Sequence, residues 1–305
     1  MDLLDRFQTH LTHLALPPGR ALVAVSGGPD SVVLLDLLHR TSASHRLELI
    51  VAHVDHGIHP ASSVVAGRVE RLARELGLPV EIGRLNLGPD AGETRAREQR
   101  YAWLEGARRR HGAAVILTAH HADDQAETVL MRVLAGSGPA GLAGITEVSG
   151  HLVRPLLPFR RGVLTRYVRE RGLAVWIDPA NQDPRHLRSW LRCDVLPILR
   201  ARLPEVDATL LRVGLQAAGD RAAWDAVLDL LPGLDPRVED GGISVAAPLV
   251  AGYDSALGQG VLLALARRAG CPMGPARAGR VLGLVARGAS GTSIPLASGW
   301  RAELA

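Results

Sequence analysis

Two polar clusters of the sequence combine residue types that could do chemistry. The first, SGGPDS, follows an apolar run and precedes a helical pattern; it comprises Ser26, Gly27, Gly28, Pro29, Asp30 and Ser31. Glycines let backbone N–H groups approach an anion, and a helix N-terminus favours negative charge there. Asp30 would repel a phosphate unless a cation lay between them, so we interpret it as a Mg²⁺ ligand. The cluster predicts a phosphate site with a divalent cation.

The second cluster, residues 119–128 (AHHADDQAET), holds two acids on one helical face, because Asp124 and Glu127 are three positions apart. His120 could join them. Paired acids beside a phosphate site suit metal binding, general-base catalysis or the binding of an ammonium group. Acids at a helix N-terminus are also favoured by the helix dipole alone, and for Asp123 both interpretations stay open.

Alternating strands and helices must position these clusters. The predicted strands are 22–25, 47–54, 80–85, 114–118 and 151–157, and the predicted helices between them are 32–38, 64–76, 93–110 and 160–171. This alternation predicts an α/β fold with a doubly wound, mainly parallel sheet. Ligands of such sheets lie beyond the carboxyl ends of the strands, where both clusters and the segment HVDHG (53–57) fall. We therefore expect one common site.

A change of composition at Pro204 predicts two domains, a catalytic domain over 1–202 and a smaller, mostly helical domain over 203–305. The second domain shows helical patterns at 206–231, 254–269 and 275–287, a strand near 243–245 and a strand or hairpin at 293–303. It holds no catalytic constellation. The glycine-rich segment 135–145 is predicted to be a flexible loop of the kind that closes over active sites.

Composition excludes several classes of protein. A hydrophobic fraction of 47% with 22% charged residues is typical of a globular protein. No apolar run reaches the roughly 18 residues of a membrane span, and the N-terminus carries no signal-peptide pattern. The two cysteines are isolated, which disfavours a disulfide framework, a zinc ribbon and an iron–sulfur site. The chain is expected to be cytoplasmic and to act away from membranes.

Every one of the 35 basic residues is arginine, and the arginines are concentrated in one segment. Between residues 154 and 202 there are eleven arginines and four acids. Such a local excess fits contact with a phosphate backbone, although a solvated helix face could also produce it. We predict a nucleic-acid-binding segment over 151–202.

The phosphate loop is neither a Walker A motif nor a dinucleotide-binding GxGxxG motif. It resembles the pyrophosphate loop of the PP-loop ATP pyrophosphatases. Over residues 21–192 the motifs SGGPDS, HVDHG, ETRAREQRY, AHHADDQAET, GSGPAGLAG, RPLL and WIDPANQD…RSWLR follow one another. This succession is similar to the tRNA(Ile)-lysidine synthetases, in their shorter, two-domain form.

The resemblance implies a ligase reaction. ATP would adenylate the C2 carbonyl oxygen of the wobble cytidine in the CAU anticodon of tRNA(Ile), with release of pyrophosphate. Free L-lysine would then attack C2 through its ε-amine and displace AMP, giving lysidine. The implied cofactors are ATP and Mg²⁺. The sequence leaves a homodimer open.

The resemblance also implies roles for individual residues. Residues 26–31 would hold the pyrophosphate with Asp30 on Mg²⁺, and Ala52 and His56 would line the ATP site. Arg100 and His120 would stabilise the α-phosphate, while Asp124 and Glu127 would hold the lysine ammonium and assist its deprotonation. The residues implied to meet tRNA phosphates are Arg154, Arg188 and Arg192.

Three departures from the family pattern weaken parts of this correspondence: Ile58-His59 after HVDHG, Ala180 before Asn181, and Ser189 where asparagine is usual. Two other functions stay open. One is another PP-loop enzyme that adenylates tRNA, such as a thiolation enzyme, although the chain has no CxxC motif. The other is a non-catalytic nucleotide- or tRNA-binding module, which would have no use for the acid pair.

Overall fold

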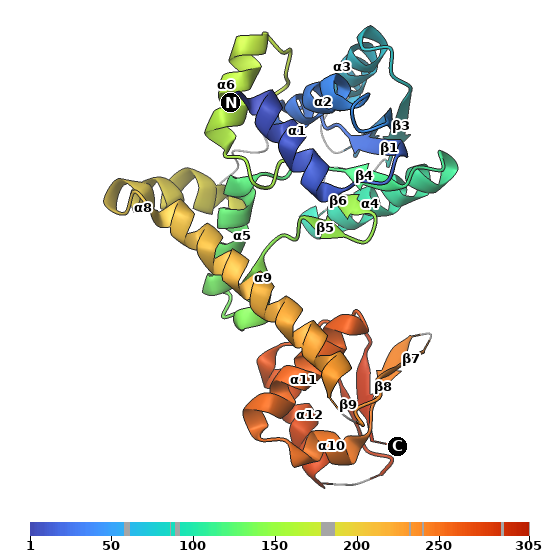
Figure 1. The fold of residues 1–305 in the computed structure, drawn as a ribbon, viewed down its shortest axis with the longest axis vertical. Coiled ribbons are helices and arrows are strands. Elements are labelled where there is room, and N and C mark those ends of the chain that lie inside the picture. Colours follow the sequence, from blue (N-terminus) through green and yellow to red (C-terminus); the bar gives the residue numbers. More distant parts are fainter. Residues whose placement is uncertain are drawn as a thin grey trace. The chain divides into compact units, whose positions relative to one another are not determined.

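The computed structural model describes residues 1–57, 62–85, 87–88, 92–177, 187–231, 233–239, 241–287 and 290–304. The chain divides into two compact units (Figure 1). Unit 1 consists of Met1–Thr128 and Ile145–Asp207, and unit 2 of Val129–Gly144 and Ala208–Ala305. Unit 2 thus takes in residues 129–144, which the sequence division counted with the first domain. Within the described residues, no helix has the length and apolarity needed to cross a membrane.

Unit 1 is built on a six-stranded sheet with the order β3-β2-β1-β4-β6-β5. Its strands are β1 (Gly19–Ala24), β2 (Leu47–Asp55), β3 (Val80–Arg84), β4 (Val115–Leu117), β5 (Val148–Ser149) and β6 (Leu152–Val153). All neighbours pair in parallel except β5, which is antiparallel to β6. The predicted mainly parallel sheet is confirmed.

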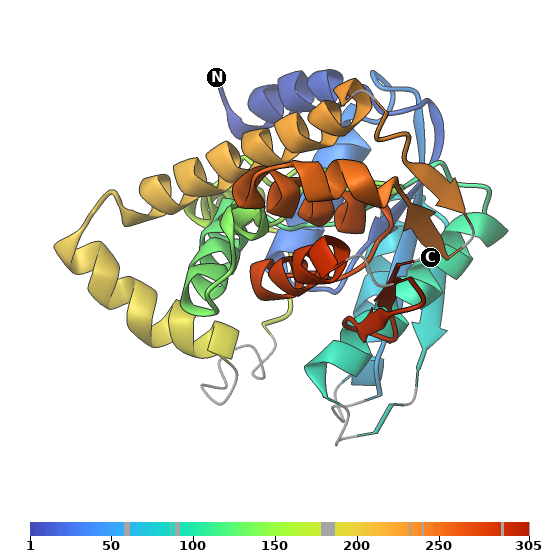
Figure 2. The ribbon, with the colours of Figure 1, turned by 90° about the horizontal axis from the view of Figure 1, so that it is seen from below.

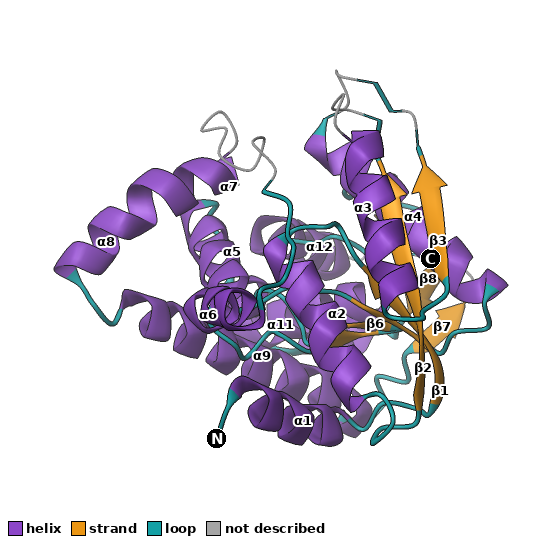
Figure 3. Cartoon of the chain, turned by 90° about the horizontal axis from the view of Figure 1, so that it is seen from above, coloured by secondary structure: helices purple, strands orange, loops and turns teal. Residues whose placement is uncertain are grey.

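Helices cover both faces of this sheet. Successive strand residues point to opposite sides, so apolar strand residues lie on both faces and each face packs against helices. Val23 faces a core that is shared with α1 (Leu3–Leu14), α2 (Pro29–Thr41), α3 (Ser62–Glu75) and α6 (Arg161–Arg171). Its neighbour Leu22 faces a second core under α4 (Glu93–Arg110). Figure 3 shows α2 and α3 packed beside the strands. The layers are those of a doubly wound fold.

The predicted strand over 151–157 is wrong beyond Val153. Pro155 has no N–H to donate to a ladder, and the chain turns there, with the Leu157 N–H donating to the Arg154 carbonyl at 3.1 Å. The short partner strand β5 was not predicted. Its two residues are exposed and carry no alternating pattern.

Three helical segments follow one another in the basic region: α7 (Leu187–Trp190), the π-helical turn η3 (Leu191–Val195) and α8 (Leu196–Arg202). They form one run of turns, yellow in Figure 2. The helix α5 (Ala122–Leu134) begins in unit 1 and ends in unit 2. The 25-residue helix α9 (Val206–Leu230) is likewise shared, and its first two residues belong to unit 1.

Unit 2 is mostly helical, as expected, and has its own core. Its elements are η1 (Pro139–Ala143), β7 (Arg237–Glu239), β8 (Gly242–Ser244), α10 (Ala247–Gly252), α11 (Ser255–Arg268), α12 (Pro275–Arg287), β9 (Ser293–Pro295) and β10 (Arg301–Glu303). Leu228, Val261 and Val281 are buried together in that core. The glycine-rich segment predicted as a loop contains the 3₁₀ turn η1, whose Gly141 carbonyl accepts a hydrogen bond from Arg132.

Candidate active site

The phosphate loop connects β1 to α2 and is held by its own hydroxyl groups. The Ser31 hydroxyl donates to the Gly28 carbonyl at 2.9 Å and accepts from the Ser26 N–H at 3.1 Å. Gly28 is the N-cap of α2 and Pro29 its first residue, a position where the missing N–H costs nothing. The first turn of α2 therefore presents free N–H groups beyond the sheet edge, which is the arrangement of an anion site.

Gly27 must be glycine for two separate reasons. Its φ of +86° lies in the left-handed region, which L side chains rarely adopt. A Cβ at this position would also lie 2.8 Å from Cγ1 of Val65 on α3. The loop thus packs closer to α3 than any side chain would permit.

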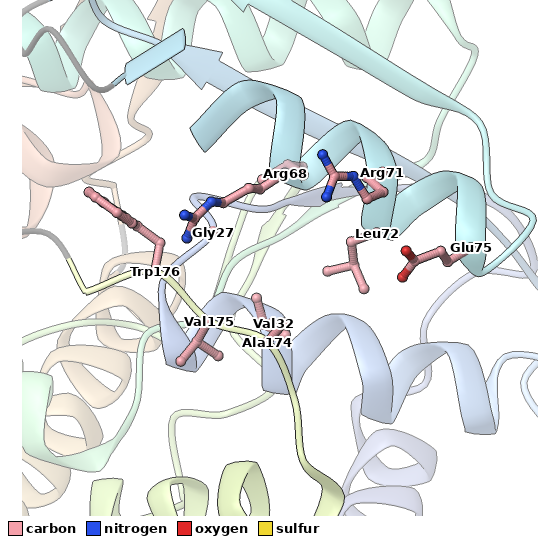
Figure 4. Close-up of a pocket in the computed structure, with 10 residues that line it drawn as sticks. Gly27, Val32, Arg68, Arg71, Leu72, Glu75, Ala174, Val175 and Trp176 are labelled. Carbon is pink, nitrogen blue, oxygen red and sulfur yellow. The ribbon is translucent and has the colours of Figure 1, made fainter. Parts of the chain in front are cut away.

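The segment Ala174–Trp176 also contacts the phosphate loop. The Trp176 N–H donates to the Gly27 carbonyl at 2.8 Å, and the Arg68 guanidinium lies over the indole ring, 5.0 Å from its centroid. Figure 4 shows Arg68 reaching from α3 to Trp176 beside a cavity of about 350 Å³. Apolar side chains, including those of Val32 and Leu72, line part of that cavity. The loop is therefore in contact with both α3 and the segment Ala174–Trp176.

In front of the loop lies a larger cavity of about 840 Å³, which is large enough for a nucleotide. The sequence-predicted residues that line it are Ser26, Gly28, Pro29, Asp30, Ser31, Ala52, His56, Arg100, His120, Asp124 and Arg192. The structure thus gathers residues from the ends of β1, β2 and β4 and from α4, α5 and η3 at one edge of the sheet, as the topology predicted.

Burial keeps three histidines of this cavity neutral. It is the main cause that lowers the pKa of His53, His56 and, to about 3, His120. His53 donates from Nδ1 to the Val25 carbonyl at 2.8 Å and so supports the entry to the loop. His120 lies 3.1 Å from the Thr118 hydroxyl through Nδ1. A neutral His120 can serve as a hydrogen-bond donor but not as a cation.

Asp30 lies in the cavity with 30% of its side chain exposed. Nε2 of the buried His121 lies 3.5 Å from its Oδ2. Burial by itself raises the pKa of Asp30, but His121, Arg161 and Arg192 outweigh burial and lower it. The carboxylate is therefore ionised and accessible at neutral pH.

Asp124 and Glu127 contact the same two guanidinium groups, as their shared helical face predicts. Arg192 donates from Nε to Oε1 of Glu127 at 2.6 Å and from Nη2 to Oε2 at 2.8 Å. Arg188 donates from Nε to Oε2 of Glu127 and from Nη2 to Oδ1 of Asp124, both at 2.9 Å. Burial by itself raises the pKa of Glu127, but the two arginines outweigh burial and lower it. The site is a compact cluster of two acids and two arginines.

The comparisons with known proteins agree with this geometry. Residues 3–199 match the PP-loop domain family. A protein named tRNA(Ile)-lysidine synthase from Novosphingobium aromaticivorans is 39% identical over 249 residues, which cover 73% of this chain and 73% of that protein. The chain belongs to the tRNA(Ile)-lysidine synthase family of PP-loop proteins.

Other members of this family are longer than the chain. The tRNA(Ile)-lysidine synthase of Alkalilimnicola ehrlichii is 42% identical over 75% of this chain, and that of Thermus thermophilus is 42% identical over 76%. These matches span only 52% and 45% of the two relatives. Among solved structures, the U34-tRNA thiolase NcsA from Methanococcus maripaludis has a TM-score of 0.58 at 16% identity and covers 71% of this chain and 80% of that one. That likeness shows a shared fold.

One residue singled out by the family resemblance, Arg154, does not lie where its implied role would need it. Arg154 is only 7% exposed, and its guanidinium donates to the Thr146 carbonyl inside unit 1. The Arg154 guanidinium is therefore not accessible to tRNA phosphates in this structure. Arg188 and Arg192 pair with Asp124 and Glu127. Ile58-His59 and Ala180 lie outside the described residues, and Ser189 lies in α7.

Sequence reasoning missed several residues of the site. Arg161 lines the cavity from the first turn of α6, and its backbone N–H donates to Oδ2 of Asp123 at 2.7 Å. It was counted only as part of the basic segment. His121 was not singled out as a site residue from the sequence, yet its backbone N–H donates to Oδ2 of Asp124 at 2.9 Å and its ring approaches Asp30. Its position in the second cluster was the available signal.

Proposed function

We propose that the protein ligates L-lysine to C2 of the wobble cytidine of tRNA(Ile) bearing a CAU anticodon, in two steps that consume ATP and release pyrophosphate and AMP. A single observation supports this function best. One cavity joins an anion-binding loop to Asp124 and Arg192, and Arg188 and Arg192 link Asp124 to the more deeply buried Glu127. A nucleotide-binding module would need the loop but not the acids.

The phosphate chain of ATP would lie on the loop, with the N–H groups of the first α2 turn and the Ser26 hydroxyl as donors. Asp30 fits a Mg²⁺ ligand, because its carboxylate is ionised, accessible and directly beside those donors. Mg²⁺ takes one or two protein carboxylates and completes its shell with water and phosphate oxygens. The cation would neutralise charge on the leaving pyrophosphate.

In the first step the C2 oxygen of cytidine attacks the α-phosphorus, and the bond to pyrophosphate breaks. Arg100 and Arg161 line the cavity as permanent cations and would stabilise the charge that develops on the phosphates. The neutral His120 would add a hydrogen bond to an α-phosphate oxygen without giving up a proton.

In the second step the ε-amine of lysine attacks C2, and the bond to AMP breaks. A protonated amine cannot attack, so the ammonium must first lose a proton. Asp124, which lines the cavity, and Glu127, which lies behind it on the same helical face, are the carboxylates that could hold the ammonium and receive that proton. Burial alone raises the pKa of Glu127 and would make it a better base once its arginine partners withdraw.

The remaining parts of the proposal concern tRNA. The basic segment would supply phosphate contacts through the partly exposed Arg188 and Arg192, and unit 2 would contact the tRNA body. Cytoplasmic location and a homodimer stay predictions.

Purified protein incubated with ATP, Mg²⁺, radiolabelled L-lysine and a CAU-anticodon transcript should place label in the RNA. Label should disappear when the wobble cytidine is changed to uridine and when Asp124 is changed to alanine. Arg109→Ala is a control for the removal of a charged side chain, because Arg109 is 73% exposed and pairs with Glu105 near the carboxyl end of α4. Full incorporation by the Asp124→Ala variant would refute the role of the acid pair, and cleavage of ATP without incorporation would refute the lysine assignment.

A further inference from the structure

The arginines of the basic segment fall into two groups when their partners are compared. Those with a partner donate to a backbone carbonyl (Arg154) or pair with carboxylates (Arg160, Arg171, Arg188, Arg192 and Arg200). Within the described residues 154–177 and 187–202, the arginines that form no ion pair are Arg161, Arg166, Arg169 and Arg202. Three of these four lie on a single helix, α6, which is labelled in Figures 1 and 3.

The outer side of α6 carries these free arginines. Leu164 and Tyr167 are buried and fix the inner side of the helix. With about 100° between successive residues, Arg169 and Arg166 project away from that inner side, and both are exposed. Glu170 is the one carboxylate of α6, and it forms no ion pair with Arg166, which lies four positions before it. The outer side of α6 therefore carries positive charge that no carboxylate of this helix neutralises.

This charged surface begins at the cavity of the proposed active site. Arg161, in the first turn of α6, lines the cavity of about 840 Å³. Arg169 lies eight residues further on, which is about 12 Å along the helix axis. A strand that inserts one nucleotide into the cavity must carry its neighbouring phosphates past the rim. Arginines bind phosphates bidentately, so the outer side of α6 suits such a strand in charge and in position.

Phosphates would meet different conditions at the other arginines beside the cavity. Arg188 and Arg192 already donate to Asp124 and Glu127, so a phosphate there competes with two carboxylates. At Arg166 and Arg169 a phosphate gains a cation and breaks no ion pair. The comparison favours α6 as a surface for an RNA backbone.

We propose that the outer side of α6, through Arg166 and Arg169, binds the phosphodiester backbone of the RNA strand whose wobble nucleotide enters the cavity beside Arg161. This inference rests on the proposed function and adds an RNA-binding surface to it. Contacts with phosphates position a strand and add affinity, but they carry no sequence information. The surface would therefore hold the strand at the cavity while other groups select the base.

The salt dependence of RNA binding tests this surface. Affinity of the full-length protein for the CAU-anticodon transcript, measured by fluorescence anisotropy between about 50 and 200 mM salt, falls with a slope set by the number of phosphate contacts. Arg166→Ala and Arg169→Ala should each make the slope shallower by about 0.7–0.9, and the double variant by about 1.4–1.8. Alanine is the best helix former and both side chains are exposed, so these variants should keep the fold.

Arg171→Ala is the matched control, because it removes the same charge from the same helix but from an arginine that pairs with Asp36 of α2 at 3.6 Å. Its slope should equal that of the wild type. The double variant should also lose affinity by the same factor for the CAU transcript and for its wobble-uridine counterpart, since backbone contacts do not read bases. An unchanged slope in the double variant, an equal change in Arg171→Ala, or a loss confined to one transcript would each overturn the proposed surface.

The incorporation assay with wild-type protein separates this inference from the ligation. Label in the RNA together with an unchanged slope in the double variant would overturn the α6 surface and retain the ligation. A shallower slope in the double variant without label in the wild-type assay would retain the surface and refute the ligation.

Discussion

Substitution of Gly27 by alanine should destabilise the protein by an amount that can be worked out from two features of the loop. The first is its backbone, which has a φ of +86° at this position. An L residue in the left-handed region costs about 1–2 kcal/mol relative to glycine, because its Cβ crowds the following carbonyl. This cost arises in the backbone itself and is independent of neighbouring side chains.

The second feature is the contact with α3. The new Cβ would lie 2.8 Å from Cγ1 of Val65, a residue that is 7% exposed and whose branched side chain has few alternative rotamers. Forcing a methyl group into such a packed position costs about 1–3 kcal/mol. Gly27→Ala should therefore lower the free energy of unfolding by about 2–5 kcal/mol in total and weaken nucleotide binding at the displaced loop.

Urea unfolding followed by circular dichroism, together with nucleotide binding, would measure both effects. Gly77→Ala is the matched control, because Gly77 has a φ of +67° and nothing within 4 Å of its would-be Cβ. That variant should lose only the backbone part. Adding Val65→Ala to Gly27→Ala should recover the packing part, seen as a coupling energy of about 1–3 kcal/mol in a double-mutant cycle.

Either of two results would contradict this prediction. One is a Gly27→Ala variant no less stable than the Gly77→Ala variant, which would mean that α3 does not restrict the loop. The other is strict additivity of the Gly27→Ala and Val65→Ala effects, which would mean that the two groups do not meet.

Three further predictions concern other parts of unit 1. Asp207→Asn should cost about 1–3 kcal/mol, less than for a fully buried pair because Arg160 and Arg200 are over a third exposed. Burial raises the pKa of Asp207, but these arginines outweigh burial and lower it. The contribution of Asp207 to the free energy of unfolding is therefore present above about pH 4 and lost below it. Unfolding curves of the wild type and the variant, measured from about pH 7 to pH 3, should converge at the low end. Between about pH 4 and pH 6 the histidine is protonated in the unfolded chain but not in the folded protein, where the pKa of His120 is about 3, so the free energy of unfolding should rise with pH. His120→Gln should reduce the slope of that rise by the equivalent of up to about one bound proton. An unchanged slope would contradict a neutral His120. Trp176→Ala should weaken nucleotide binding by about tenfold, since it removes the indole that lies against Arg68 and so keeps the Trp176 N–H on the Gly27 carbonyl, and an unchanged affinity by calorimetry would show that this ring contact is dispensable.

Local patterns of the sequence were sufficient for most of the fold. The helix predicted over 93–110 has those bounds in the structure, because its continuous charged pattern is flanked by Gly92, the N-cap, and by Gly112, which has a φ of +62°. The position of the phosphate loop could also be predicted, since a strand, two glycines and a helix start are adjacent in the chain. The parallel order of the strands then places the clusters at one edge without further information.

Pairings between distant charges could not be predicted in this way. Glu127 and Arg188 are 61 positions apart, and an arginine in a basic segment has the same composition signal whether it contacts phosphate, water or a carboxylate. Arg154 illustrates the same difficulty, because arginine is rarely buried and nothing nearby in the sequence indicates that its guanidinium donates to the Thr146 carbonyl. The family motifs named these residues, but their partners depend on tertiary structure.

The two adjacent acids at the start of α5 explain how one helix end serves both structure and chemistry. Successive residues of a helix project about 100° apart, so Asp123 and Asp124 must face different neighbours. Asp123 binds Arg160 and the Arg161 N–H, which fixes the start of α6, and this contact explains its presence without a catalytic role. Asp124 faces the cavity and Arg188 instead. The helix dipole favours both carboxylates, but of the two it is Asp124 that lines the cavity.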